Sequence, residues 1–158
     1  MDRFVGEGIT FDDVLIGESV GATGGSVYLE LGQARSVMTG LINDNTHDQR
    51  INSPVAAASV FFGGKLAVAM LSADAWPDLL VYIARPPGAS DNRGAVLTFV
   101  NSSGSLPAAY SGMVRNDLAG NASDRLGFGL ATGMFPGPTM ISDLTGDLRS
   151  EVLTGMRY

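Results

Sequence analysis

The chain has 158 residues, of which 45 % are hydrophobic and 16 % are charged, and its formal net charge is −6. This length suits one domain, and the apolar fraction is too high for an intrinsically disordered chain. The acidic balance, without any cluster of Lys and Arg, argues against a nucleic-acid partner, and no apolar run approaches the ~18 residues that a membrane span requires.

Short apolar segments separated by Gly, Ser, Asn, Asp and Pro predict strands rather than helices. No window holds an apolar stripe of helical period over three turns without Gly or Pro interrupting it. In chain order, the predicted strands cover residues 14–16, 26–31, 55–62, 66–71, 79–83, 95–100, 126–132 and 152–154. Strands of this length and spacing indicate an all-β sandwich, barrel or propeller.

Three sequence markers recur along the chain with nearly the same spacing. An acidic residue precedes a short apolar segment at Asp13, Asp78 and Glu151, with intervals of 65 and 73 residues. The segments GSVYL and GAVLT lie 69 residues apart, and FGGKLAVA and LGFGLATG lie 64 residues apart. A repeat of this length holds about four strands, which is the content of one propeller blade.

The order of these markers resembles the FG-GAP repeats of integrin-α-type β-propellers. The fullest unit reads FFGGKLAVAM, SADAWPD, LLVYIARPPGASDNRG and AVLTFVNSSG in succession. A partial unit before it reads FDDVLIGES and GGSVYLELG, and a partial unit after it reads RLGFGLATGMF and DLTGDLRSEVLTG. The likeness covers most of the chain.

The resemblance implies an all-β domain over residues 1–158, built from tandem four-stranded antiparallel blade units. The units cover approximately residues 1–53 (partial), 54–124 (full) and 125–158 (partial). Because about two blade equivalents cannot close a ring, we expect a partial or decayed propeller, or one completed by self-association into a homo-oligomer.

The resemblance also implies a calcium loop, since repeats of this family carry a D-x-[DN]-x-D-G-x-x-D segment whose oxygens converge on one ion. In the last unit the corresponding residues are Asp143, Thr145, Asp147 and Glu151. A weaker set in the second unit is Ser72, Asp74 and Asp78. The alternative at both places is a capped turn, closed in the second unit by Trp76 and Pro77.

The expected function is a non-catalytic binding or adhesion module of a surface or extracellular protein, steadied by calcium. The partner would be a protein or a glycan held by the loops 32–53 and 101–124. The alternatives are an accessory domain of a hydrolase and a small oligomeric structural protein.

Several enzyme classes are excluded by the sequence. There is no Cys for a nucleophile or a thiolate zinc site, and the single histidine, His47, excludes sites that need two imidazoles. No G-x-S-x-G segment is present, and we expect His47 to be an exposed loop residue. The opening segment MDRFVGEG lacks the features of a secretory signal, so an extracellular location is expected only as part of a longer exported chain.

Overall fold

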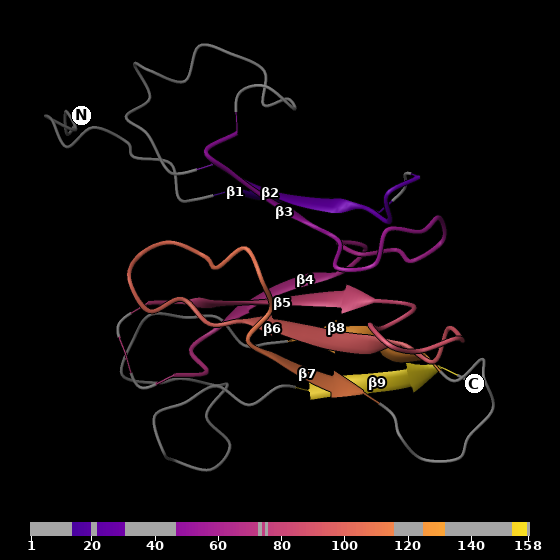
Figure 1. Ribbon diagram of the computed structural model, residues 1–158. Helices are drawn as coiled ribbons and strands as arrows, with labels where there is room; N and C mark the ends of the chain where they lie inside the picture. The colour runs from indigo at the N-terminus through magenta and orange to yellow at the C-terminus, as the bar shows by residue number, and fades with distance from the viewer. Residues whose placement is uncertain are drawn as a thin grey trace, which may run out of the picture.

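The structure, a computed structural model, describes residues 14–19, 22–30, 47–72, 74, 76–115, 125–131 and 153–157. All regular secondary structure in these residues is β-strand, so the all-β prediction is confirmed for the described part of the chain (Figure 1). Within the same residues, no helix is long and apolar enough to cross a membrane.

The described strands form three antiparallel sheets, and in each sheet neighbouring strands follow one another in the sequence. The first sheet contains β1 (Val14–Glu18), β2 (Ser26–Glu30) and β3 (Gln49–Asn52). The second contains β4 (Leu66–Ala69), β5 (Asp78–Ile83), β6 (Ala95–Phe99) and β7 (Gly112–Arg115). The third contains β8 (Arg125–Ala131) and β9 (Leu153–Arg157), with an irregularity between Leu126 and Gly129.

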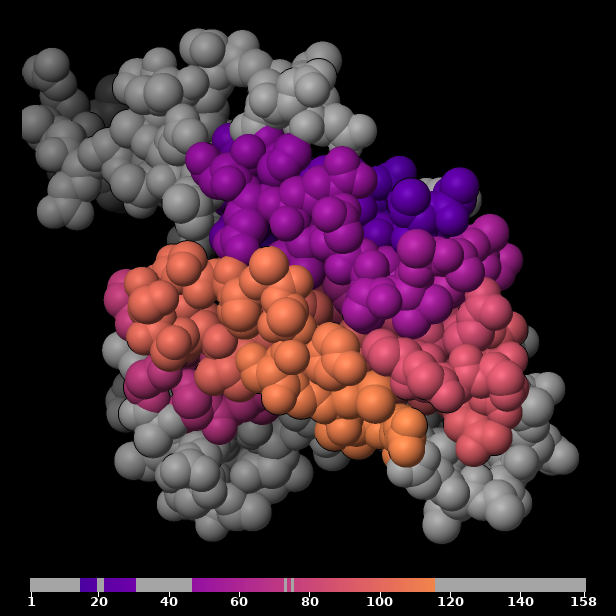
Figure 2. Space-filling model, viewed as in Figure 1, coloured from indigo at the N-terminus to yellow at the C-terminus, as the bar shows by residue number. Residues whose placement is uncertain are grey.

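The second sheet lies between the other two (Figure 1), and β5, one of its two inner strands, is buried at every residue. Successive side chains of a strand point to opposite faces. Leu79 and Val81 therefore pack with Val27 and Ile51 of the first sheet, whereas Leu80 belongs to a smaller cluster on the other face. Strand β8 lies against β4, β5 and β6, and Figure 2 shows the segment around β3 in direct contact with the second sheet.

The predicted strand over residues 55–62 is wrong, because this segment connects the first sheet to the second without strand pairing. Ser59 and Phe61 have φ angles of 64° and 55°, which break an extended conformation. Val60 and Phe62 are fully buried, since the connection inserts both side chains into the core between the sheets. The apolar composition of the segment thus reflects its burial rather than a strand.

Glycines allow this connection to approach the β1–β2 hairpin very closely. A Cβ atom on Gly17 would lie 1.9 Å from the carbonyl oxygen of Gly63, and one on Gly25 would lie 2.3 Å from that of Phe62. The Phe62 backbone N–H donates to the carbonyl oxygen of Gly24 at 3.1 Å. The Phe62-Gly63 pair is therefore fastened to the β1–β2 hairpin.

Strands β3 and β7 lie in segments that the sequence analysis expected to be loops, 32–53 and 101–124. Each pairs with one neighbour in the described sheets, β2 for β3 and β6 for β7. A strand at a sheet edge needs few apolar residues, and β3 (QRIN) buries only Ile51 completely. The expectation of loops is wrong for these eight residues.

Candidate functional site

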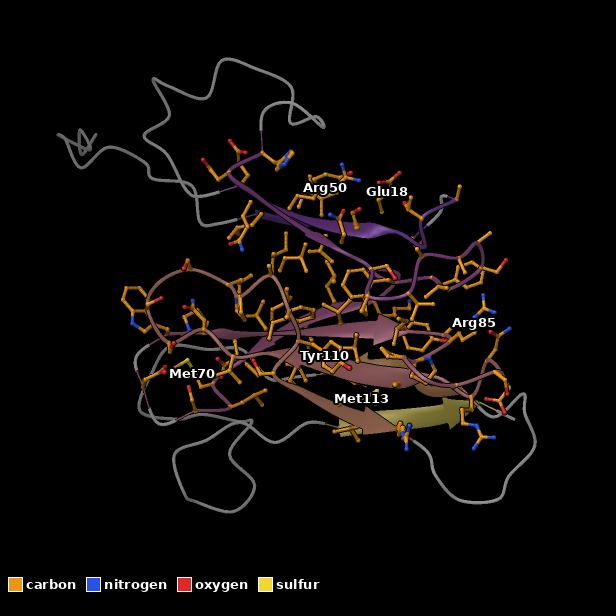
Figure 3. All side chains as sticks on the ribbon, in the orientation of Figure 1. Glu18, Arg50, Met70, Arg85, Tyr110 and Met113 are labelled. Atoms are coloured by element: carbon orange, nitrogen blue, oxygen red, sulfur yellow. The ribbon has the colours of Figure 1, made fainter. Side chains whose placement is uncertain are left out.

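The β4–β5 loop (residues 70–77) and the β6–β7 loop (residues 100–111) leave the second sheet at the same end. In Figure 3, Met70 lies at this end, whereas Arg85, which follows β5, lies at the opposite end. We call these two segments the paired loops. The functional candidates among the described residues are concentrated here.

The paired loops are joined by the carboxylate of Asp78, the first residue of β5. Asp78 is completely buried. Its Oδ2 accepts hydrogen bonds from the backbone N–H groups of Leu71 (2.8 Å) and Ser72 (3.0 Å), and its Oδ1 accepts one from the N–H of Asn101 (2.8 Å). Because this one side chain accepts hydrogen bonds from both loops, it fixes both of them to the core strand.

The β6–β7 loop is also braced internally. Asn101 Oδ1 accepts hydrogen bonds from the N–H groups of Ser103 (3.3 Å) and Gly104 (2.9 Å). Leu106 inserts into the core and is 8 % exposed, and its carbonyl accepts a hydrogen bond from the Gln49 side chain of the first sheet. This loop is therefore held at several points between its two strands.

Trp76 lies across the two loops and is 45 % exposed. Its backbone N–H donates to Asp74 Oδ1 at 2.9 Å, which makes the tight turn expected at this position. A Cβ atom on Gly104 would lie 3.1 Å from both Cη2 and Cζ3 of the indole and 3.5 Å from Cζ2. Nearly equal distances to three ring atoms place Gly104 over the face of the six-membered ring.

The weaker calcium set does not present converging free oxygens in this arrangement. Asp78 Oδ2 also accepts the Ser72 hydroxyl at 3.4 Å, so three donors face that one oxygen and would repel a cation. Asp74 Oδ1 accepts the Trp76 N–H. No group of three or more acidic, His or Cys side chains able to hold a metal occurs among the described residues. We therefore derive no chemistry from calcium at Ser72, Asp74 and Asp78.

The stronger calcium set lies outside the described residues. Asp143, Thr145, Asp147 and Glu151 all fall between β8 and β9, in a part of the chain for which the structure gives no placement. Calcium binding there remains a prediction from the sequence.

A second polar cluster covers the face of the first sheet that points away from the second sheet. Figure 3 shows Glu18 and Arg50 on this face. The Tyr28 hydroxyl donates to Glu18 Oε2 at 2.9 Å, and the Arg50 guanidinium lies 5.3 Å from the Tyr28 ring centroid. His47 lies outside the strands, as expected, but it is half-buried with its ring 5.1 Å from that of Tyr28, so the expectation of an exposed His47 is wrong.

At the opposite end of the second sheet, the β5–β6 loop carries an ion pair between near neighbours in the sequence. Arg93 Nε donates to Asp91 Oδ1 at 2.7 Å, and a second guanidinium nitrogen donates to Oδ2. These hydrogen bonds hold the pKa of the Asp91 carboxyl below its usual value of 3.8. The pair is partly exposed and stabilises the loop locally.

In comparisons with known proteins, the chain matches no family model, no curated protein and no solved structure. The function is therefore inferred from the paired loops themselves. Sequence reasoning treated Asp78 as a weak metal ligand and did not identify its role in joining two loops. The sequence feature that could have indicated this role is an acidic residue directly before a wholly apolar segment. A carboxyl group buried at such a position needs several hydrogen-bond donors from neighbouring residues.

Proposed function

We propose that the chain is a non-catalytic binding module that presents the paired loops to a partner outside the cell. The observation that carries this proposal is the buried Asp78 carboxylate, which holds Leu71, Ser72 and Asn101 in fixed positions. Loops ordered before binding lose less conformational entropy when a partner binds. A rigid sheet stack that carries braced loops is well suited to recognition.

We further propose that the three sheets are successive units of one blade-like repeat. Strands β1, β2 and β3 match β5, β6 and β7 in order and antiparallel pairing, and β8 and β9 match β4 and β5. Corresponding strands begin at residues 14 and 78, 26 and 95, and 49 and 112. This spacing agrees with the sequence markers and supports a propeller-type arrangement, which remains a proposal.

Site-directed blocking tests whether the paired loops form the binding surface. Because the chain has no Cys, single Cys residues can be introduced for coupling to polyethylene glycol. Ser102 and Ser90 are both exposed, the first in the β6–β7 loop and the second in the β5–β6 loop at the other end. The Ser102→Cys and Ser90→Cys variants therefore form a matched pair.

The labelled protein is applied to arrays of extracellular proteins and glycans, with and without the polymer. We expect binding to at least one array component, lost when the polymer is on residue 102 and retained when it is on residue 90. Binding that is blocked only from residue 90 contradicts the assignment to the paired loops, and no binding to any component contradicts the module itself.

A further inference from the structure

The exposed indole of Trp76 is held in a fixed position by a continuous series of contacts that begins in the core. Buried Asp78 fixes the backbone of Asn101, and the Asn101 side chain fixes the N–H of Gly104. Gly104 lies against the Trp76 ring, and Asp74 fixes the Trp76 backbone. The ring is therefore ordered before any ligand arrives, although almost half of the residue is exposed.

Both the backbone conformation and the ring contact favour glycine at position 104. Its φ angle is +81°, and any Cβ atom would press on the six-membered ring at 3.1 Å. Gly104 lies against one face of the six-membered ring, and 45 % of Trp76 remains exposed. The loop thus supports the indole from one side, and we infer that the opposite face is the one open to a ligand.

The paired loops carry several exposed short polar side chains. Ser102, Ser103 and Ser105 are exposed and flank Gly104 in the sequence, and exposed Asp74 lies two residues before Trp76. Neither of the paired loops, residues 70–77 and 100–111, contains Lys or Arg. The two loops themselves therefore offer hydroxyl groups and a carboxylate but no cation for a phosphate, sulfate or carboxylate ligand.

The other large exposed hydrophobic side chains among the described residues lie elsewhere. Phe61 is in the β3–β4 connection, Ile16 is in β1 and Val114 is in β7. Protein-binding hot spots are surrounded by further contacts that exclude water. Besides Trp76, the exposed apolar residues described in the paired loops are the small Pro77, Ala108 and Ala109. No second large apolar side chain is exposed in the described part of these loops, which favours a small hydroxylated ligand over a protein surface.

We propose that Trp76 is a stacking platform for a neutral sugar ring, and this proposal rests on the binding function proposed above. The C–H groups on one face of a pyranose carry partial positive charge and contact the negative face of the indole. The hydroxyl groups at the ring edge exchange hydrogen bonds with the serine hydroxyls and Asp74. An acidic sugar is disfavoured, because Asp74 repels it and the loops supply no cation.

Trp76 is the single tryptophan of the chain, so tryptophan fluorescence reports on this site alone. The wild-type protein is titrated with methyl β-D-glucopyranoside, methyl β-D-galactopyranoside and cellotriose, and acrylamide quenching is measured at each concentration. At least one neutral sugar is expected to shift the emission saturably and to protect the ring from acrylamide. Methyl β-D-glucuronide, which has the same ring with a carboxylate, is expected to bind more weakly.

Variants separate stacking from a general effect on the fold. By calorimetry, Trp76→Ala is expected to lose about tenfold or more in sugar affinity, and Trp76→Phe less. Phe61→Ala, which removes an exposed aromatic ring outside the paired loops, is expected to bind as the wild type does. The melting temperatures of all three variants show that the fold is intact.

Absence of any sugar-dependent change, unaltered sugar binding by Trp76→Ala, or protection of Trp76 only by proteins overturns this proposal. The array experiment distinguishes failure of the sugar platform from failure of the binding module. If Trp76→Ala binds the arrays fully while polymer on residue 102 still blocks binding, the binding module stands and the sugar platform is wrong.

Discussion

Asp78 accepts a hydrogen bond from the backbone N–H of Asn101, 23 residues further along the chain, at 2.8 Å. The same carboxylate holds the N–H groups of Leu71 and Ser72. It thus determines the relative position of two loops that the sequence places far apart. A buried acidic side chain is costly unless it is hydrogen-bonded, so this residue and the loop conformations depend on one another.

Replacing Asp78 should destabilise the whole protein. Asp78→Ala leaves three backbone donors, one buried and two partly buried, without their acceptor, and we expect a loss of about 3 kcal/mol in the free energy of unfolding. Asp78→Asn keeps the shape but turns an amide N–H group toward at least one of these donors, at a cost of about 1–3 kcal/mol. Urea denaturation measures both changes.

The control for this prediction is Asp74→Asn. Asp74 is exposed, and an asparagine side chain still accepts the Trp76 N–H, so the change should stay within about 0.5 kcal/mol. Equal effects at positions 74 and 78 would contradict the assignment of the bracing role to Asp78.

Two adjacent phenylalanines should differ sharply in their contribution to stability. Phe62 is fully buried between the first and second sheets, with its ring 6.2 Å from that of Phe99. Phe62→Ala should cost about 3–5 kcal/mol, because it leaves a cavity in the core. Phe61 is 39 % exposed, and Phe61→Ala should cost less than about 1 kcal/mol. Thermal and urea unfolding measure the stability of the two variants. Similar losses of stability would contradict the position of the β3–β4 connection, in which Phe62 is buried and Phe61 is exposed.

Glycine substitutions should separate steric contact from backbone strain. Gly17→Ala places a Cβ atom 1.9 Å from the Gly63 carbonyl oxygen, so we expect a loss of about 3 kcal/mol or more, or failure to fold. Gly88 has a φ angle of +78° but no atom within 4 Å of an added Cβ. Gly88→Ala should therefore cost only the conformational strain, about 1 kcal/mol. If the two variants are equally stable, the first sheet does not approach the connection as described.

The Asp91–Arg93 pair makes a prediction about pH. Because Arg93 lowers the pKa of the Asp91 carboxyl in the folded protein, the pair contributes stability above the unfolded value of 3.8. That contribution is lost as the pH falls through the lower folded value. An NMR titration of the Asp91 carboxyl should give a midpoint below 3.8, and Arg93→Gln should move it upward toward that value. A midpoint that Arg93→Gln does not raise would contradict the ion pair.

Calcium is expected to stabilise the chain through the last acidic loop of the sequence. If Asp143, Thr145, Asp147 and Glu151 bind the ion, calcium at 100 times its dissociation constant should add about 2.7 kcal/mol and raise the melting temperature. Asp147→Ala should remove the effect, whereas Asp74→Asn should leave it unchanged. No calcium-dependent shift in the wild-type protein would exclude this role.

Most strands could be predicted because their sequences contain apolar residues bounded by turn formers. Strand β5, for example, begins after Pro77 and is apolar from Leu79 to Ile83. The edge strands β3 and β7 could not be recognised, since QRIN and GMVR show no strong pattern and are strands only through pairing with β2 and β6. The reverse error occurred at residues 55–62, where buried apolar side chains belong to a connection.

Local composition by itself determined the all-β class of the described residues and the positions of the inner strands, because short apolar segments between turn residues have few other ways to bury their side chains. The contacts that hold the paired loops in place were decided only by the tertiary structure. Asp78 accepts a hydrogen bond from Asn101, and Gly104 contacts the Trp76 ring. The two residues of each pair are more than 20 positions apart in the sequence, so no local sequence pattern predicts these contacts. These contacts form because stacking the sheets buries the Asp78 carboxylate, whose hydrogen bonds must then come from the neighbouring loops.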